Sequence, residues 1–281
     1  MSEPQDRTTL AILAAAATGI QVGAAITATR FAIDMAGPAS LAFLRYAIGA
    51  ACLAPVFFSG RMRFARADIV PIALLGIGQF GVLIALLNFG LKSVPSARAA
   101  LIFASFPMLT LLFAALVGQE RLTGAKVAGV ALTVVGVGFA LGDRTLGEAS
   151  LLGELAVLAA AATGAVCSVL YRPYLRRYPA LPVSAFAMLA AVIALALPAM
   201  LDDLAGAVWR LTPLGWAAVI FIGLSSGGGY VLWLWALANT SATRVTVFLS
   251  LSPITAAVLG ALLLGEAVSS TMLAGCGCVA L

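Results

Sequence analysis

Two glutamines, Gln21 and Gln79, stand inside long apolar stretches of the sequence. A glutamine amide has two donors and two acceptor sites, which are hard to satisfy in hydrocarbon. The same groups suit the ammonium and the carboxylate of a zwitterion. We therefore predict that both amides contact a polar substrate, with a purely structural role as the alternative.

Other polar and aromatic side chains recur at helical spacing. Thr163, Cys167 and Tyr171 are four residues apart and share one helix face. A Ser or Thr in a membrane helix bonds more often to a carbonyl of its own helix or to a neighbouring helix. Aromatic rings either stack on a planar substrate or fill gaps between helices. With these alternatives open, the candidate substrate-binding residues are Gln21, Gln79, Phe80, Phe103, Thr163, Cys167, Tyr171, Ser226, Tyr230, Trp233 and Ser250.

A second group of residues is suited to movement. Each proline removes one backbone hydrogen bond near mid-membrane, and each of three consecutive glycines weakens a helix by about 1 kcal/mol relative to alanine. The glycines therefore mark a hinge or an unwound cavity wall. Two arginines at helix starts either gate the two openings or anchor the helices at the interface. The candidate hinge or gating residues are Pro107, Pro253, Gly227, Gly228, Gly229, Arg98 and Arg244.

Arg45 is the one charge in the interior of a predicted span, since the other charges lie near span ends. A charge at mid-membrane costs on the order of 3 kcal/mol, so the guanidinium must be paired or must reach an interface. We favour a structural latch over substrate binding.

The elements that must position these residues are membrane helices. The 281 residues are 63% hydrophobic and 10% charged, with a mean hydropathy of +1.11. Long stretches without charge match the roughly 20 apolar residues that a helical crossing needs, and nothing alternates with the period of barrel strands. The predicted helices are residues 9–29, 38–59, 69–91, 95–117, 123–142, 151–171, 182–201, 213–237, 243–264 and 268 to the end. From Ala267 only 15 residues remain, so we expect the last helix to be truncated.

The chain nearly repeats itself. Arg98, Pro107, Glu120 and Gly129 recur 146 positions later as Arg244, Pro253, Glu266 and Gly275, and the sequence 14–19 returns at 159–164. Because each half has five helices, the second copy enters the membrane from the opposite face. We therefore predict an all-α integral membrane protein with ten transmembrane helices in two inverted repeats, 1–146 and 147–281. Such repeats support alternating access, with a duplication kept only for stability as the alternative.

Loop charges predict the orientation. Ten basic residues fall on one side, at Arg7, Arg61, Arg63, Arg66, Arg121, Lys126, Arg172, Arg176, Arg177 and Arg244, and five on the other, at Arg30, Lys92, Arg98, Arg144 and Arg210. Both termini are therefore predicted to be cytoplasmic. Basic loops explain the net charge of +5, so no nucleic-acid partner is expected. The first apolar segment is too long for a cleavable signal peptide.

Several motifs resemble a known family. Pro38 to Arg45, Pro107, Gly118 to Glu120 and Leu263 to Glu266 are similar to the drug/metabolite transporter superfamily, EamA type. Within it, the chain looks most similar to aromatic amino acid exporters of the YddG kind, which are bacterial inner-membrane carriers. The resemblance covers essentially the whole chain. It implies ten helices, inverted five-helix repeats and a cavity lined by helices 1, 3, 4, 6, 8 and 9.

These observations predict a transporter and not an enzyme. The sequence has no histidine, no nucleotide-binding lysine loop and no carboxylate inside a span, and its four cysteines lie in apolar segments, so we expect no cofactor, metal or disulfide. A phosphate-ester carrier would need Lys or Arg in the cavity, which the expected lining helices do not provide.

We expect a monomer or weak dimer in the bacterial inner membrane that exports amino acids, especially aromatic ones, as a uniporter or exchanger. The alternatives are proton coupling through a terminal carboxylate such as Glu154, other metabolites or drugs as substrates, and an intramembrane enzyme or scaffold.

Overall fold

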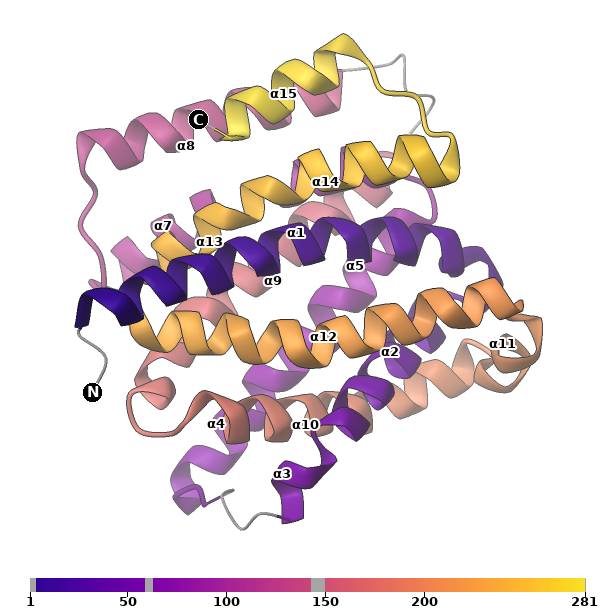
Figure 1. The fold of residues 1–281 in the computed structure, drawn as a ribbon, viewed down its shortest axis with the longest axis horizontal. Helices are drawn as coiled ribbons and strands as arrows, with labels where there is room; N and C mark the ends of the chain where they lie inside the picture. The colour runs from indigo at the N-terminus through magenta and orange to yellow at the C-terminus, as the bar shows by residue number, and fades with distance from the viewer. Residues whose placement is uncertain (1–3, 59–62, 143–149, 281) are drawn as a thin grey trace.

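The computed structural model describes residues 4–58, 63–142 and 150–280 (Figure 1), and within these ranges the chain is helical with no strand. Arg61, Arg144 and the predicted boundary between the halves at 146/147 lie outside the described residues, as does the side chain of Arg7. The first half contains α1 (Pro4–Ala36), α2 (Pro38–Cys52), α3 (Ala54–Phe58), α4 (Arg66–Gly76), the π-helical segment η1 (Ile77–Val82), α5 (Leu83–Leu91), α6 (Ser96–Phe103), α7 (Phe106–Leu116) and α8 (Gly124–Gly142). The second half contains α9 (Leu151–Leu175), α10 (Ala180–Leu201), α11 (Leu204–Arg210), α12 (Pro213–Asn239), α13 (Ala242–Val247), the 3-10 segment η3 (Phe248–Ser250), α14 (Leu251–Leu259), the π-helical segment η4 (Gly260–Leu264) and α15 (Ser270–Ala280).

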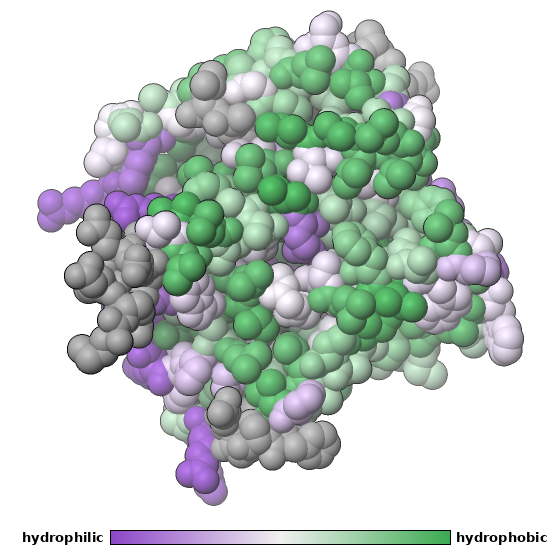
Figure 2. Space-filling view, viewed as in Figure 1, coloured by the Kyte–Doolittle hydropathy of each residue, from purple (hydrophilic) through white to green (hydrophobic). Residues whose placement is uncertain are grey.

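Each predicted segment contains helix. In the described part of the chain, seven helices are long and apolar enough to cross a membrane unaided. The segments that fall short are α2 with α3, which are separated at Leu53, the glycine-rich α8, and the eleven-residue α15. The face shown in Figure 2 is largely hydrophobic, as lipid contact requires, with most of its strongly hydrophilic side chains near the edges and one near the middle.

Two differences from the predicted boundaries have local causes. α1 does not end at residue 29 but continues to Ala36. Arg30 and Asp34, one turn apart in this added segment, form an ion pair at 3.2 Å that stabilises the helix there. The short helix α11 was not predicted. Asp203 begins it from a left-handed conformation and accepts a hydrogen bond from the Gly206 amide.

Packing follows the same pattern in the two halves. α1 contacts α12 and α14, while α9, at the corresponding place in the second half, contacts α5 and α7. α2 packs on α12, and α10 packs on α4 and η1. α2 also contacts α10, and α8 lies against α15 at one side of the bundle (Figure 1). These contacts between halves therefore have counterparts with the halves exchanged.

The helices that carry Pro107 and Pro253 are both interrupted just before the proline. α6 ends at Phe103 and α7 begins at Phe106, and η3 separates α13 from α14. Proline cannot donate to the carbonyl four residues earlier, which explains a break in the preceding turn. A glycine of the first span and its counterpart in the sixth span pack closely on residues at these two breaks. A Cβ on Gly19 would overlap the carbonyl oxygen of Phe248, and one on Gly164 would overlap the Phe106 ring.

We predict that Gly19→Ala lowers stability by about 1–3 kcal/mol, because the new methyl group meets a backbone carbonyl that cannot move aside. Gly138→Ala is the matched control, since no described atom lies within 4 Å of a Cβ there. It should be neutral or stabilising by up to about 1 kcal/mol. Thermal unfolding in detergent measures both, and equal midpoints would contradict the close approach.

Candidate substrate-binding site

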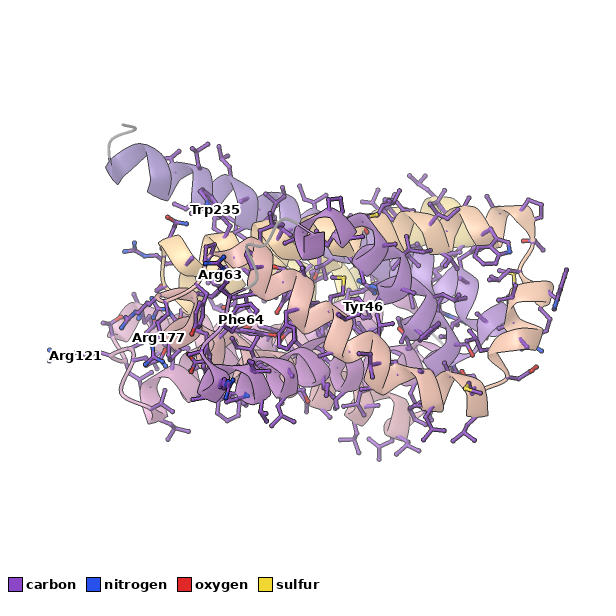
Figure 3. All side chains as sticks on the ribbon, turned by 90° about the horizontal axis from the view of Figure 1, so that it is seen from below. Tyr46, Arg63, Phe64, Arg121, Arg177 and Trp235 are labelled. Atoms are coloured by element: carbon purple, nitrogen blue, oxygen red, sulfur yellow. The ribbon has the colours of Figure 1, made fainter. Side chains whose placement is uncertain are left out.

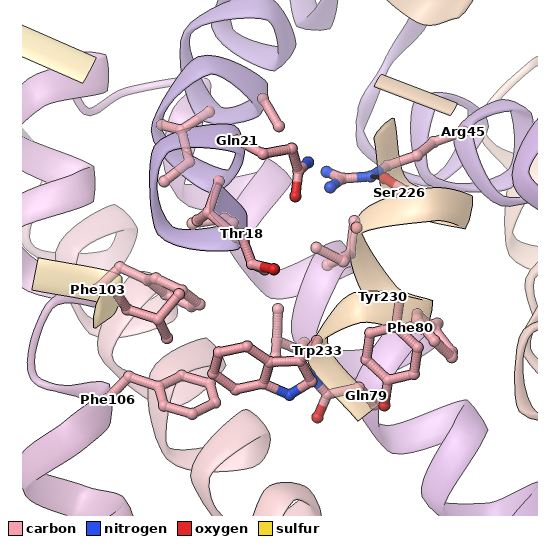
Figure 4. A pocket seen from close by; sticks show the side chains of 18 of the residues that line it. Thr18, Gln21, Arg45, Gln79, Phe80, Phe103, Phe106, Ser226, Tyr230 and Trp233 are labelled. Carbon is pink, nitrogen blue, oxygen red and sulfur yellow. Dashed lines mark hydrogen bonds between the residues drawn. The ribbon is translucent and has the colours of Figure 1, made fainter. Parts of the chain in front are cut away.

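A cavity of about 90 Å³ lies among α1, α2, η1, α5, α6, α7, α12 and η3 (Figure 4). This volume holds several water molecules. Seven of the predicted substrate-binding residues line it, namely Gln21, Gln79, Phe80, Phe103, Ser226, Tyr230 and Trp233. Thr18, Arg45, Tyr46 and Phe106 also face it. The cavity combines a polar side with an aromatic side.

The polar side is built around the middle of α12, where this helix faces α1 and α2. The Gln21 amide donates to Ser225 Oγ at 3.1 Å, and Arg45 Nε donates to Ser226 Oγ at 2.6 Å. Both serine hydroxyls donate back to the carbonyl of Ile222. Each hydroxyl proton is thus directed along the helix, which leaves the oxygen to accept from the side chain across the cavity.

The aromatic side consists of two groups of ring contacts. Phe80 lies 4.2 Å from Tyr230 and 4.9 Å from Tyr46, measured between ring centroids. Phe106 packs edge-on against Trp233 at 6.1 Å and against Phe103 at 5.5 Å. Because aromatic faces attract cations and planar groups, this wall can receive an apolar side chain or an ammonium group.

Gln79, in the π-helical segment η1, lies beside Trp233 and Phe80 on the aromatic side (Figure 4). A π-segment displaces side chains from regular helical positions and is frequent at functional sites. Gln79 is 9% exposed, and its Oε1 has no hydrogen-bond partner among the described residues. A buried amide oxygen without a partner carries a desolvation cost of about 1–3 kcal/mol, which a donor on a bound molecule would remove.

The predicted substrate-binding residues of the sixth span, which is α9, do not line this cavity. Thr163 donates to the Ala159 carbonyl of its own helix, Cys167 lies against Gly78, and Tyr171 is fully buried behind Tyr230 at 6.4 Å between rings. Ser250 lines a separate cavity of about 310 Å³ beside Pro107 and Lys126. No residue of α9 is among those that line the central cavity, because Tyr171 lies behind Tyr230, Cys167 lies against Gly78, and the Phe106 ring packs on Gly164. The roles of Thr163, Cys167 and Tyr171 in substrate binding stay a prediction.

The second span takes that place, and Arg45 is the residue that sequence reasoning undervalued. A Cβ on Gly49 or on Gly227 would lie within 3.4 Å of the other's backbone, so α2 and α12 meet closely. Arg45 sits one turn before Gly49 and reaches Ser226 across this contact. Its cost as the single charge inside a span was the available signal. The expectation that the cavity lacks Lys or Arg is corrected by this position.

The glycines of α12 have three different surroundings. Gly227 allows the contact with α2, Gly229 makes room for the Gln21 amide, and Gly228 has no described atom within 4 Å of a Cβ. The helix is continuous from Pro213 to Asn239, so the unwound wall that the glycines suggested is absent from this segment. Their role as a hinge stays a prediction.

Arg98 and Arg244 differ despite their matched positions. Arg98 is buried and forms an ion pair with Glu154 at the start of α9. Arg244 is exposed, and the residue that corresponds to Glu154 in the first half is Thr9. Among the described side chains, which begin at Thr9, Arg98 therefore forms this ion pair and Arg244 forms no corresponding one. Their role in gating stays a prediction.

Two matched glutamates join the interrupted helices. Glu266 accepts hydrogen bonds from the Ser96 amide at 3.0 Å and from its hydroxyl, and Glu120 accepts from the Thr243 amide at 3.3 Å. Each carboxylate thus caps the start of the helix in the other half. Desolvation raises the pKa of Glu120, but hydrogen bonds from Lys126 and Thr243 lower it by more. The pKa of Glu120 therefore lies below its ordinary value.

Comparison with known proteins decides the family. The model of the EamA-like transporter family matches the chain twice, at residues 9–142 and 151–281. The chain belongs to the EamA-like transporter family. This membership makes it a multi-pass membrane transporter, and the resemblance of its motifs to the drug/metabolite transporter superfamily is confirmed.

Individual relatives of this EamA chain include amino acid exporters. It is 33% identical over 263 residues to a protein of Streptantibioticus cattleyicolor named a probable terminal-alkyne amino-acid exporter, covering 91% of this chain and 86% of the relative. It is 26% identical to the threonine/homoserine exporter RhtA of Salmonella typhimurium, covering 96% and 88%. An uncharacterized transporter of Archaeoglobus fulgidus is 27% identical over 92% of both chains. One crystal structure shares the fold with a TM-score of 0.69 at 23% identity, covering 94% and 93%.

We predict that Gln79→Leu leaves stability unchanged or raised, because it removes a buried acceptor without a partner, yet lowers transport about tenfold by removing a contact with the substrate. Gln119→Leu is the control, since Gln119 lies outside the cavity and contacts the Val169 carbonyl. Uptake into vesicles and unfolding midpoints test both effects. A loss of stability with unchanged transport would make Gln79 structural.

The glycine that faces the Gln21 amide gives a second test of the cavity. In Gly229→Ala the new Cβ would lie 2.6 Å from Gln21 Oε1 and would displace the amide from Ser225. We expect transport to fall about fivefold, the equivalent of one lost hydrogen bond. Gly138→Ala, at a helical position with open space around it and outside the predicted hinge, should transport normally. Equal activity of the two variants would show that the position of Gln21 does not matter.

Proposed function

We propose that this EamA-family protein exports amino acids by alternating access, with ten membrane crossings arranged as two inverted five-helix repeats. The observation that carries the proposal is the cavity with one polar and one aromatic side, lined by helices from both halves. An amino acid has matching polar and apolar ends. Amino acid export by two relatives supports the same class of substrate.

The two glutamate caps support the inverted arrangement. The end of the fourth span caps the start of the ninth, and the end of the ninth caps the start of the fourth, so these two corresponding helices run antiparallel. The exchanged contacts of α1 with α12 and of α9 with α5 support the same relation. Halves of opposite direction can exchange conformations, which would open the cavity first to one side and then to the other.

The arrangement of charge supports cytoplasmic termini. Arg63, Arg121 and Arg177 gather at one end of the bundle (Figure 3), where the predicted cytoplasmic loops carry most of the basic residues. We place the protein in the bacterial inner membrane on this basis and on that of its exporter relatives.

For energy, we propose uniport or exchange along the substrate gradient. Glu154, the carboxylate considered for proton coupling, is held by Arg98. An aromatic preference is supported by the rings of Phe80, Tyr230 and Trp233 in the cavity wall. Carriers of other metabolites coupled to protons are the second candidate.

Purified protein in liposomes tests the proposal. With internal unlabelled phenylalanine or threonine, we expect labelled amino acid to enter by exchange, at a rate that an imposed pH gradient does not change. Phenylalanine should exceed threonine because of the aromatic wall. Strict dependence on the pH gradient would overturn uniport or exchange, and no uptake of any amino acid would overturn the substrate class. Liposomes without protein are the control.

A further inference from the structure

Arg45 is an arginine in the cavity without a carboxylate partner. It is 8% exposed, and its Nε atom donates to Ser226 Oγ. No described Asp or Glu lies within 4.0 Å of its guanidinium. The described carboxylates that form ion pairs do so with other basic residues, near helix ends. The guanidinium carbon also lies 5.5 Å from the centre of the Tyr46 ring. The charge therefore rests on one hydroxyl and one aromatic face.

The Nε contact fixes the direction of the guanidinium and leaves its outer edge free. Figure 4 shows the end of Arg45 directed toward Gln21, above the aromatic residues of the cavity. A guanidinium has five N–H donors, of which the described contacts use the one at Nε. Two parallel donors of a planar fork match the two oxygens of a carboxylate.

A structural latch does not account for this arrangement. α2 and α12 already meet through Gly49 and Gly227, and a neutral donor could reach Ser226 at a lower cost than a charge. An unpaired charge in the membrane interior is stabilised most by an anion in contact with it. Because the transported molecule is what enters this cavity, it is the available source of that anion.

We propose that Arg45 binds the carboxylate of the transported molecule, so that the cavity takes monocarboxylates and rejects their amine or amide counterparts. This inference rests on the proposed transport site. One cation in an otherwise uncharged lining balances one negative charge, whereas a phosphate ester would bring up to two. Gln21 acts as a positioning residue beside the guanidinium, and the aromatic side receives the rest of the molecule.

Matched small molecules separate the carboxylate from the ring and the amine. The unfolding midpoint of the purified protein is measured with phenylalanine, 3-phenylpropionate, phenethylamine and phenylalanine amide. A ligand that binds the folded protein raises the midpoint. We expect phenylalanine and 3-phenylpropionate to raise it, and the two compounds without a carboxylate to leave it unchanged. Equal shifts with all four compounds, or none with either carboxylate, would overturn the inference.

Variants separate binding from a latch. Arg45→Gln should keep or raise the midpoint of the free protein, lose the shift with carboxylates, and raise the half-saturating concentration of phenylalanine at least about tenfold. Arg45→Lys should recover part of the affinity because it keeps the charge without the fork. Lys92→Gln removes an exposed charge and should behave as wild type. A lower midpoint in Arg45→Gln with unchanged carboxylate shifts would make Arg45 a latch.

The two proposals fail in different ways. If the wild type exchanges amino acids in liposomes and Arg45→Gln does so with the same half-saturating concentration, the carboxylate site is wrong and transport stands. If carboxylates raise the midpoint through Arg45 while liposomes carry no amino acid, the anion site stands and amino acid transport is wrong.

Discussion

The structure depends on satisfying backbone groups at helix ends and breaks inside a membrane. A backbone amide without a partner in hydrocarbon costs several kcal/mol, so an interrupted helix persists only where protein groups cover the interruption. Here Gly164 packs on Phe106 next to the break before Pro107, and Glu266 caps the start of that helix. Gly19 packs on Phe248 at the break before Pro253, and Glu120 caps the start of that helix. The fourth and ninth spans are therefore held by each other and by the first and sixth.

This constraint also explains why the cavity forms where it does. The first span approaches η3 closely through Gly19 and α14 through Gly23, which places Gln21 between these two contacts and turns it toward α12. The second span approaches α12 through Gly49 and Gly227, which places Arg45 one turn away. Close contact at small residues sets the backbone positions, and the polar side chains between those contacts face the remaining space.

The sequence was sufficient for the helical segments and for much of the cavity, because charge-free length and isolated polar residues are local signals. Gln21 and Gln79 could be identified from their cost in lipid alone. The position of Thr163 and Cys167 outside the cavity could not, since it depends on which other helices pack against α9, as η1 does at Cys167 and α7 at Gly164. Arg45 was recognised as costly, but its partner Ser226 is 181 positions away and its role required knowing which helix lies opposite. The continuous helix through Gly227 likewise reflects packing on Gly49, which no local propensity reveals.

The two halves correspond in their backbone and differ in their charges. Arg98 pairs with Glu154, whereas Arg244 is exposed and the residue that corresponds to Glu154 in the first half is the uncharged Thr9. Arg45 corresponds to no charge in the second half, where its equivalent 146 positions on is Ala191. A shared backbone allows both openings, while an unequal distribution of charge makes them unequal in energy. If Arg45 takes the substrate carboxylate, closing the cavity around substrate buries a paired charge, and closing it empty buries an unpaired one. The loaded protein then changes conformation at lower cost than the empty protein, which favours exchange over uniport as the mode of transport.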